Sequence, residues 1–160
     1  MRLSRIFINT GVADVTAPIL TSPTGTKTGS STADGTVITD EANGTMYAVV
    51  DESATPPSVA QIQAGDGSGG AAADWSGNQA IGSVGTKTFN ATGLAASTLY
   101  YFYFQHTDAA SNDSSVVSST SFTTDAAGGF QAAWAKNVNT LIFAKRLTKN
   151  WMLSEERTWI

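Results

Sequence analysis

Residues 99–107 alternate in a pattern that an extended strand satisfies and a helix does not. They read Leu-Tyr-Tyr-Phe-Tyr-Phe-Gln-His-Thr. Successive side chains of a strand point to opposite faces, so Tyr100, Phe102, Phe104 and His106 share one face. A helix would scatter the same four side chains around its axis. An aromatic face of this size needs a second layer to cover it, and the stretch therefore predicts a central strand of a layered all-β structure.

Shorter elements with turn residues between them flank this strand. We expect further strands over residues 18–22, 32–39, 45–50, 84–90 and 116–124, and one short helix over 58–64. Ser58 is the expected N-cap of that helix, and Gly65 is expected to end it. The Gly- and Ala-rich residues 65–78 are predicted to form a surface loop. Several short strands at this spacing indicate an antiparallel β-sandwich.

Charge divides the chain into three parts. Residues 16–125 carry two basic and ten acidic side chains, net -8, whereas the remaining residues carry seven basic and three acidic ones, net +4. Three of the four tryptophans lie after residue 133. We therefore expect an N-terminal anchoring segment over 1–15, a sandwich over 16–125 and a basic, aromatic C-terminal anchoring segment over 126–160. Both terminal segments have strand character.

The stretch from Gly93 to Tyr100, followed by the aromatic strand, resembles the tyrosine corner of the fibronectin type III and immunoglobulin-like family. The resemblance covers residues 16–124. It implies that Leu94 fills part of the core and that the Tyr100 hydroxyl bonds to nearby backbone. Four further stretches, 39–41, 47–50, 57–62 and 108–114, look like the variant with a short helix that occurs on bacteriophage virions and bacterial surface proteins. The chain departs from immunoglobulin domains in having no cysteine.

The amino-acid composition excludes several kinds of catalytic and metal site. Without cysteine there is no disulfide, thiolate zinc site or cysteine nucleophile, and one histidine cannot build a multi-histidine metal centre. A triad of His106, Asp108 and a nearby serine is conceivable, but the inward position of His106 favours a packed histidine. Asp108, Asn112 and Asp113 offer oxygens to calcium, although a hairpin turn uses such residues equally well. We expect no enzyme activity, no cofactor and no metal.

The other face of the aromatic strand leaves two interpretations open. Tyr101 and Tyr103 point away from the expected core and are candidates for a glycan-stacking face. Alternatively, they pack under a neighbouring strand or a terminal segment, which is the interpretation that we favour.

The terminal segments carry the candidate protein interface. Its candidate residues are Arg2, Arg5, Phe7, Trp134, Leu141, Phe143, Arg146, Trp151 and Trp159. Aromatic and arginine side chains dominate the energetics of interfaces. We expect them to contact other virion proteins of the capsid or tail, or another copy of this chain. The alternative is that both ends pack on their own sandwich.

A function follows from these expectations. The acidic balance argues against nucleic acid as a partner, and no apolar run is long enough to span a membrane. The N-terminus lacks the apolar stretch of a secretory signal, so we expect synthesis in the host cytoplasm.

A surface-type module without an export signal fits a virion released by lysis. We expect a non-enzymatic bacteriophage virion protein, for capsid decoration or tail association, whose termini attach an outward-displayed module. The alternative is a carbohydrate-binding adhesin or receptor-binding module.

Overall fold

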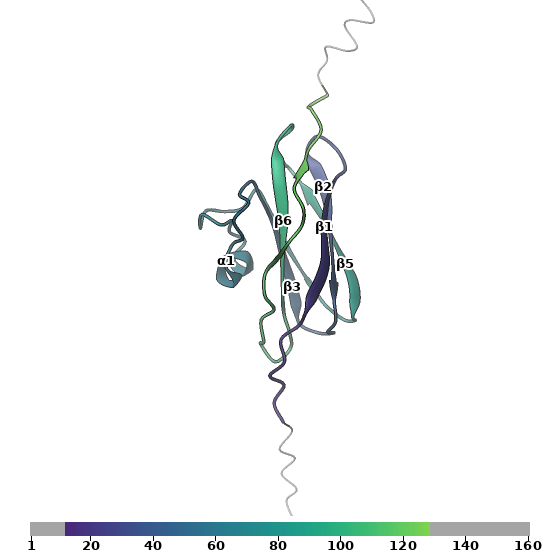
Figure 1. Cartoon of the computed structure of the whole chain (residues 1–160), viewed down its shortest axis with the longest axis vertical. Coiled ribbons are helices and arrows are strands. Elements are labelled where there is room, and N and C mark those ends of the chain that lie inside the picture. The colour runs from purple at the N-terminus through teal and green to yellow at the C-terminus, as the bar shows by residue number, and fades with distance from the viewer. Residues whose placement is uncertain (1–11, 129–160) are drawn as a thin grey trace, which may run out of the picture. The chain divides into compact units, whose positions relative to one another are not determined.

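Two antiparallel sheets pack face to face in the computed structural model, which describes residues 12–128 (Figure 1). One sheet has the strand order β1-β2-β5, and the other has the order β4-β3-β6-β7, with β8 also paired to β6. The strands are β1 (Leu20–Lys27), β2 (Thr32–Thr39), β3 (Thr45–Asp51), β4 (Trp75–Ala80), β5 (Gly85–Thr92), β6 (Leu99–Thr107), β7 (Val117–Ser118) and β8 (Phe122–Thr123). The fold is the all-β sandwich that the sequence predicts, and it is compatible with an immunoglobulin-like or fibronectin type III-like arrangement.

Alternating side chains of the two sheets fill the core between them. Phe102 and Phe104 of β6 are fully buried, with their rings stacked at a centroid distance of 5.6 Å. Trp75 of β4 meets Phe102 edge-on, at 6.1 Å. On β2, a Cβ added to Gly35 would lie 2.6 Å from the Phe102 ring. Glycine therefore occupies a strand position that no larger residue fits beside that aromatic side chain.

Tyr100 forms the corner that the resemblance implies. Its side chain is fully buried, and its hydroxyl accepts a hydrogen bond from the Ala95 N–H, at 3.0 Å. Leu94, only 4 % exposed, belongs to the main core cluster. The expected burial of Tyr100 and its backbone hydrogen bond are both present.

Helix α1 (Val59–Ala64) covers the outer face of β3 and β6 (Figure 1). It begins with a capping box: the Ser58 side chain accepts a hydrogen bond from the Gln61 N–H, and the Gln61 side chain accepts one from the Ser58 N–H. It ends at Gly65, whose φ of 83° is left-handed. Ile62 buries itself against Val49 and Tyr103 in a second, smaller core cluster. The predicted helix and both of its caps are confirmed.

Among residues 12–128, no helix has the length and apolar character needed to cross a membrane.

The last strand differs from the continuous one predicted over 116–124. It is divided into β7 and β8, and the pairing register with β6 shifts by one position from one to the other. Ser119 lies in this gap. Its N–H donates to the Phe102 carbonyl and its Oγ accepts the Phe102 N–H. A hydroxyl thus occupies the place of a backbone carbonyl, and the ladder continues through a bulge.

The same hydroxyl pairing occurs three times along this edge. Ser114 pairs with His106 in the same way, and Thr124 pairs with Thr98. The three hydroxyl residues are five positions apart, whereas their partners, on β6 and just before it, are four apart, so each step contains one extra residue. The extra residues explain why the edge does not form one regular strand.

Two other expectations were wrong. β1 continues through Pro23 to Lys27, whereas the strand was expected to end at residue 22. A register shift between Thr21 and Thr24 accommodates the proline in an edge strand. Residues 75–78, predicted to be loop, belong to β4. There Trp75 packs against the core, and pairing with β3 supplies the backbone hydrogen bonds.

Candidate functional site

The candidate interface residues lie outside the described part of the chain. They are Arg2, Arg5, Phe7, Trp134, Leu141, Phe143, Arg146, Trp151 and Trp159. Their role in contacts, and the terminal anchoring segments to which they belong, stay predictions.

Tyr103 is not available as a glycan platform. It is fully buried in a cluster with Val49 and with Ile62 of helix α1, and its hydroxyl donates to the Ser53 carbonyl at 2.6 Å. Burial, with the charge of Asp51 and the neighbouring phenol of Tyr101, raises the pKa of Tyr103 to about 12. Of the two interpretations left open for Tyr101 and Tyr103, the glycan-stacking face is therefore wrong for Tyr103, which is packed as favoured, although against helix α1 and not under a strand or a terminal segment. Tyr101 is half-buried, and the two rings pack together at a centroid distance of 6.3 Å.

His106 is a structural residue of the core. It is fully buried, and its Nε2 N–H donates to the Asn43 carbonyl at 2.8 Å. The other ring nitrogen, Nδ1, forms a hydrogen bond with the Thr39 hydroxyl at 3.0 Å. Both ring nitrogens are thus engaged with residues other than Asp108, and the histidine–aspartate part of a triad is not assembled.

Asp108 organises the turn that follows β6. One carboxylate oxygen accepts from the Ala110 and Asn112 N–H groups, and the other accepts from the Asn112 side chain. Burial alone would raise the pKa of Asp108, but these hydrogen bonds outweigh it and hold the pKa below its ordinary value. Asp113 points elsewhere, toward Gln63 and Thr107. The three residues considered for calcium therefore act as turn and network residues and do not converge.

A cluster of three carboxylates forms beside this turn. Oxygens of Asp14, Glu41 and Asp108 lie within 4.8 Å of one another. Burial, followed by the charges of Asp108 and Asp14, raises the pKa of Glu41 above its ordinary value. The consequence of this crowding is a pH-dependent contribution of Glu41 to stability.

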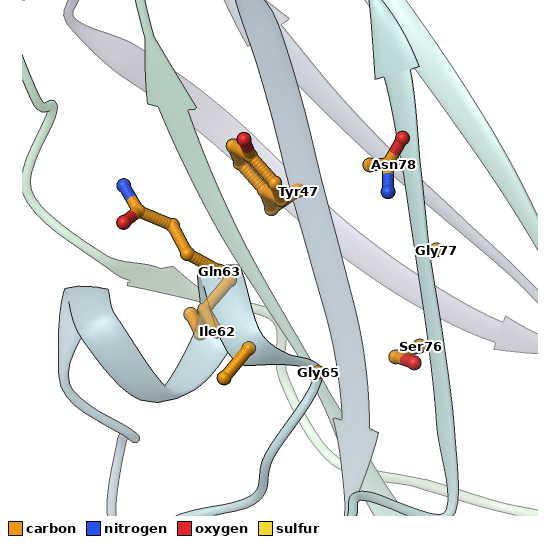
Figure 2. A pocket seen from close by; sticks show the side chains of 8 residues that line it. Tyr47, Ile62, Gln63, Gly65, Ser76, Gly77 and Asn78 are labelled. Carbon is orange, nitrogen blue, oxygen red and sulfur yellow. The ribbon is translucent and has the colours of Figure 1, made fainter. Parts of the chain in front are cut away.

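A small pocket opens between the end of α1 and the outer face of β3 and β4 (Figure 2). Its volume is about 150 Å³. The lining residues are Tyr47, Ile62, Gln63, Ala64, Gly65, Ser76, Gly77 and Asn78. Tyr47 and Asn78 are direct partners across β3 and β4, so their side chains lie next to each other on this face. The pocket thus combines one aromatic ring with amide and hydroxyl groups.

Gln63 is fixed by a polar network at the rim of this pocket. Its Nε2 donates to Thr107 Oγ1 and to Asp113 Oδ1, both at 3.0 Å. Gln105, fully buried, donates to the same two oxygens. The network holds the helix against β6 and orients the Gln63 side chain.

Gly65 brings the helix end close to β4. A Cβ at this position would lie 2.9 Å from Ser76 Oγ, and the left-handed φ also favours glycine. The sequence indicated that Tyr47 lies in a strand and that Gly65 ends a helix, but not that they meet. The sequence did not predict β4, which brings them together, because this strand lacks β-branched residues.

The chain enters and leaves the sandwich at opposite ends (Figure 1). At the Asp40 end, the Ile19 N–H donates to the Asp40 carboxylate and the Asp40 N–H donates to the Ile19 carbonyl. At the Asp125 end, the Asp125 N–H donates to the Gly29 carbonyl. These two ends are separated by the length of β2, which is 8 residues, or roughly 25 Å at about 3.3 Å per residue.

Comparison with known proteins finds no family model that matches the chain and no match among curated proteins.

Proposed function

We propose that this protein is a non-enzymatic structural protein of a bacteriophage virion, in which the sandwich is a rigid module between two attachment segments. The observation that carries the proposal is the position of the two ends of the sandwich. The chain is bonded into the fold at Ile19 on one side and at Asp125 on the other. A module with this geometry spans a distance between two attachments.

The way the ends are fastened supports a load-transmitting role. At the Asp125 end, the Ser97 N–H donates to the Asp125 carbonyl, and the Lys27 ammonium pairs with the Asp125 carboxylate. The ion pair is about half exposed and adds little stability by itself. The backbone bonds, however, join the departing chain to two different loops. The sandwich therefore holds the direction of the chain at both ends.

The virion assignment rests on the sequence resemblance, and the attachment role of residues 1–15 and 126–160 rests on their basic and aromatic composition. The module is acidic while the terminal segments are basic, which favours contact of the terminal segments with an acidic neighbour and leaves the sandwich repelled from it. This asymmetry favours attachment through the terminal segments over attachment through the sandwich.

Electron microscopy of intact particles tests the proposal. An antibody raised against residues 16–125 should label purified virions at regularly repeated positions. Mass spectrometry of the same particles should recover the chain in a fixed ratio to the major capsid or tail protein. Absence of the chain from purified virions, with abundant chain in the infected-cell lysate, would contradict the proposal.

A further inference from the structure

The pocket between α1 and β4 has the chemistry of a sugar site. We propose that it binds one neutral hexopyranose ring, either free or as a unit of a surface glycan, stacked on Tyr47. A cavity of about 150 Å³ holds a six-membered ring without substituents, such as benzene. This pocket has that volume and is open to solvent, so the sugar ring would enter it with part of its hydroxyls at the mouth. The inference goes beyond the structural role proposed above and does not depend on it.

The lining offers both kinds of contact that a sugar requires. One face of a pyranose ring carries C–H groups and packs on an aromatic ring, while its edge carries hydroxyls that need hydrogen-bond partners. Tyr47 supplies the aromatic surface and is half-buried at the base of the site. Ser76 and Asn78, both exposed on β4, supply a hydroxyl and an amide beside it (Figure 2).

Several polar atoms of the lining have no partner within residues 12–128. The Gln63 amide points away from Ser76 and Asn78, toward Thr107 and Asp113, so it holds the rim of the pocket and is not counted among the ligand contacts (Figure 2). Neither the amide of Asn78 nor the hydroxyl of Ser76 makes a hydrogen bond to another described residue. The hydroxyl of Ser76 and the amide of Asn78 are therefore the polar groups that face a ligand beside Tyr47.

The site is held in place before any ligand arrives. The capping box and Gly65 fix both ends of α1, and the Thr107–Asp113 network fixes Gln63. Pairing of Tyr47 with Asn78 fixes the distance between the aromatic ring and the amide. Such preorganisation reduces the entropy lost on binding, which matters for a ligand that makes few contacts.

Charge selects a neutral ligand. Within residues 12–128, the lining contains no carboxylate and no basic side chain. The Asp113 carboxylate lies directly behind Gln63 and repels an anionic sugar. We therefore expect neutral hexoses to bind and sialic acid to be excluded.

Titration of the full chain with methyl glycosides, followed by amide NMR, tests the proposal. Methyl glycosides of glucose, galactose, mannose and N-acetylglucosamine serve as probes, and the methyl glycoside of N-acetylneuraminic acid serves as the charged comparison. At least one neutral glycoside should shift the amides of Tyr47, Gly65 and residues 76–78 in a saturable manner. Retention on insoluble polysaccharides then separates a free sugar from a glycan-linked one as the ligand.

Two variants and a matched control complete the test. Asn78→Ala should weaken binding by roughly tenfold, the loss that one or two hydrogen bonds carry, and Tyr47→Ala should abolish it. Asn78 is exposed on an edge strand, so its replacement tests the site even if Tyr47→Ala disturbs folding. Asn90→Ala, on the exposed face of the other sheet, is the control and should bind as the natural chain does. The proposal is overturned if no neutral glycoside shifts these amides, if the charged glycoside binds equally well, or if Asn78→Ala binds with unchanged affinity.

Discussion

Ser119 bonds to Phe102 twice: its N–H donates to the Phe102 carbonyl at 2.9 Å, and its Oγ accepts the Phe102 N–H at 3.0 Å. Phe102 is fully buried, so water cannot replace the hydroxyl. We expect Ser119→Ala to lower the free energy of unfolding by about 1–3 kcal/mol, the cost of an unsatisfied buried donor. Urea denaturation measures this loss, and hydrogen exchange of the Phe102 amide should accelerate with it.

Ser118→Ala is the matched control for that variant. Ser118 precedes Ser119 in the chain and is exposed. Its replacement should change the free energy of unfolding by less than about 0.5 kcal/mol. Equal effects of the two substitutions would mean that the hydroxyl of Ser119 does not support the strand pairing.

The hydroxyl of Tyr100 should contribute less than that of Ser119. It accepts from the Ala95 N–H, and Ala95 is exposed, so water can satisfy the freed N–H in Tyr100→Phe. We expect a loss of about 1 kcal/mol in the free energy of unfolding. Tyr101→Phe, at a half-buried neighbouring position, is the control. A Tyr100→Phe variant as stable as the natural chain would show that the corner hydrogen bond has no net value.

Glu41 should make stability depend on pH in an unusual direction. Its pKa lies above the ordinary value of 4.5 because of burial and the nearby Asp108 and Asp14 carboxylates. The folded state therefore binds this proton more tightly than the unfolded chain. Stability is lost as the pH rises through the raised pKa.

Glu41→Gln removes this titration. We expect the variant to be more stable than the natural chain at pH 7, and the difference to disappear below the ordinary pKa of 4.5, where both states carry the proton. Urea midpoints at the two pH values provide the comparison. Glu52→Gln, at an exposed position outside the cluster, should show no such pattern. A Glu41→Gln variant that is less stable at pH 7 would contradict this account.

A fragment of residues 16–125 should fold by itself. All eight strands, helix α1 and both core clusters lie within these bounds. Circular dichroism and dispersed NMR signals should match those of the sandwich in the full chain. If the fragment is unfolded while the full chain is folded, the terminal segments belong to the core.

Deletion of residues 129–160 should prevent attachment to the particle. This segment contains the aromatic and basic candidates, and loss of an interface hot spot typically costs at least about 2 kcal/mol. The truncated chain should no longer co-sediment with virions that lack the protein, although its sandwich stays folded. Raising the salt concentration should weaken attachment of the full chain only in part, because apolar contacts are not screened. Binding of the truncated chain at full strength would place the attachment site on the sandwich.

The parts of the fold that local chemistry determines were predictable. The alternation of residues 99–107 indicated β6 and its buried face, and Ser58 and Gly65 marked the ends of α1. These features depend on side chains that are near one another in the sequence. The tyrosine corner is equally local, since Ala95 and Tyr100 are five positions apart.

The parts that a distant partner determines were not predictable. After Trp75, the sequence of β4 contains no residue with a strand preference, and pairing with β3 imposes its extended form. Division of the last strand depends on hydroxyls that bond to β6, and serine and threonine give no sign of this in a chain rich in both. The pocket needed β4 and α1 to be placed together, so no local pattern indicated it.

The separation between Ile19 and Asp125 determines what repetition of this module would produce. In a module whose two chain ends emerge side by side, a duplicated copy would lie beside the first one and would not extend it. Here the incoming chain is bonded at the Asp40 end and the outgoing chain at the Asp125 end. Each tandem copy would therefore add its own length, roughly 25 Å along the strands. Duplication or loss of the segment would lengthen or shorten the row of modules without changing its cross-section.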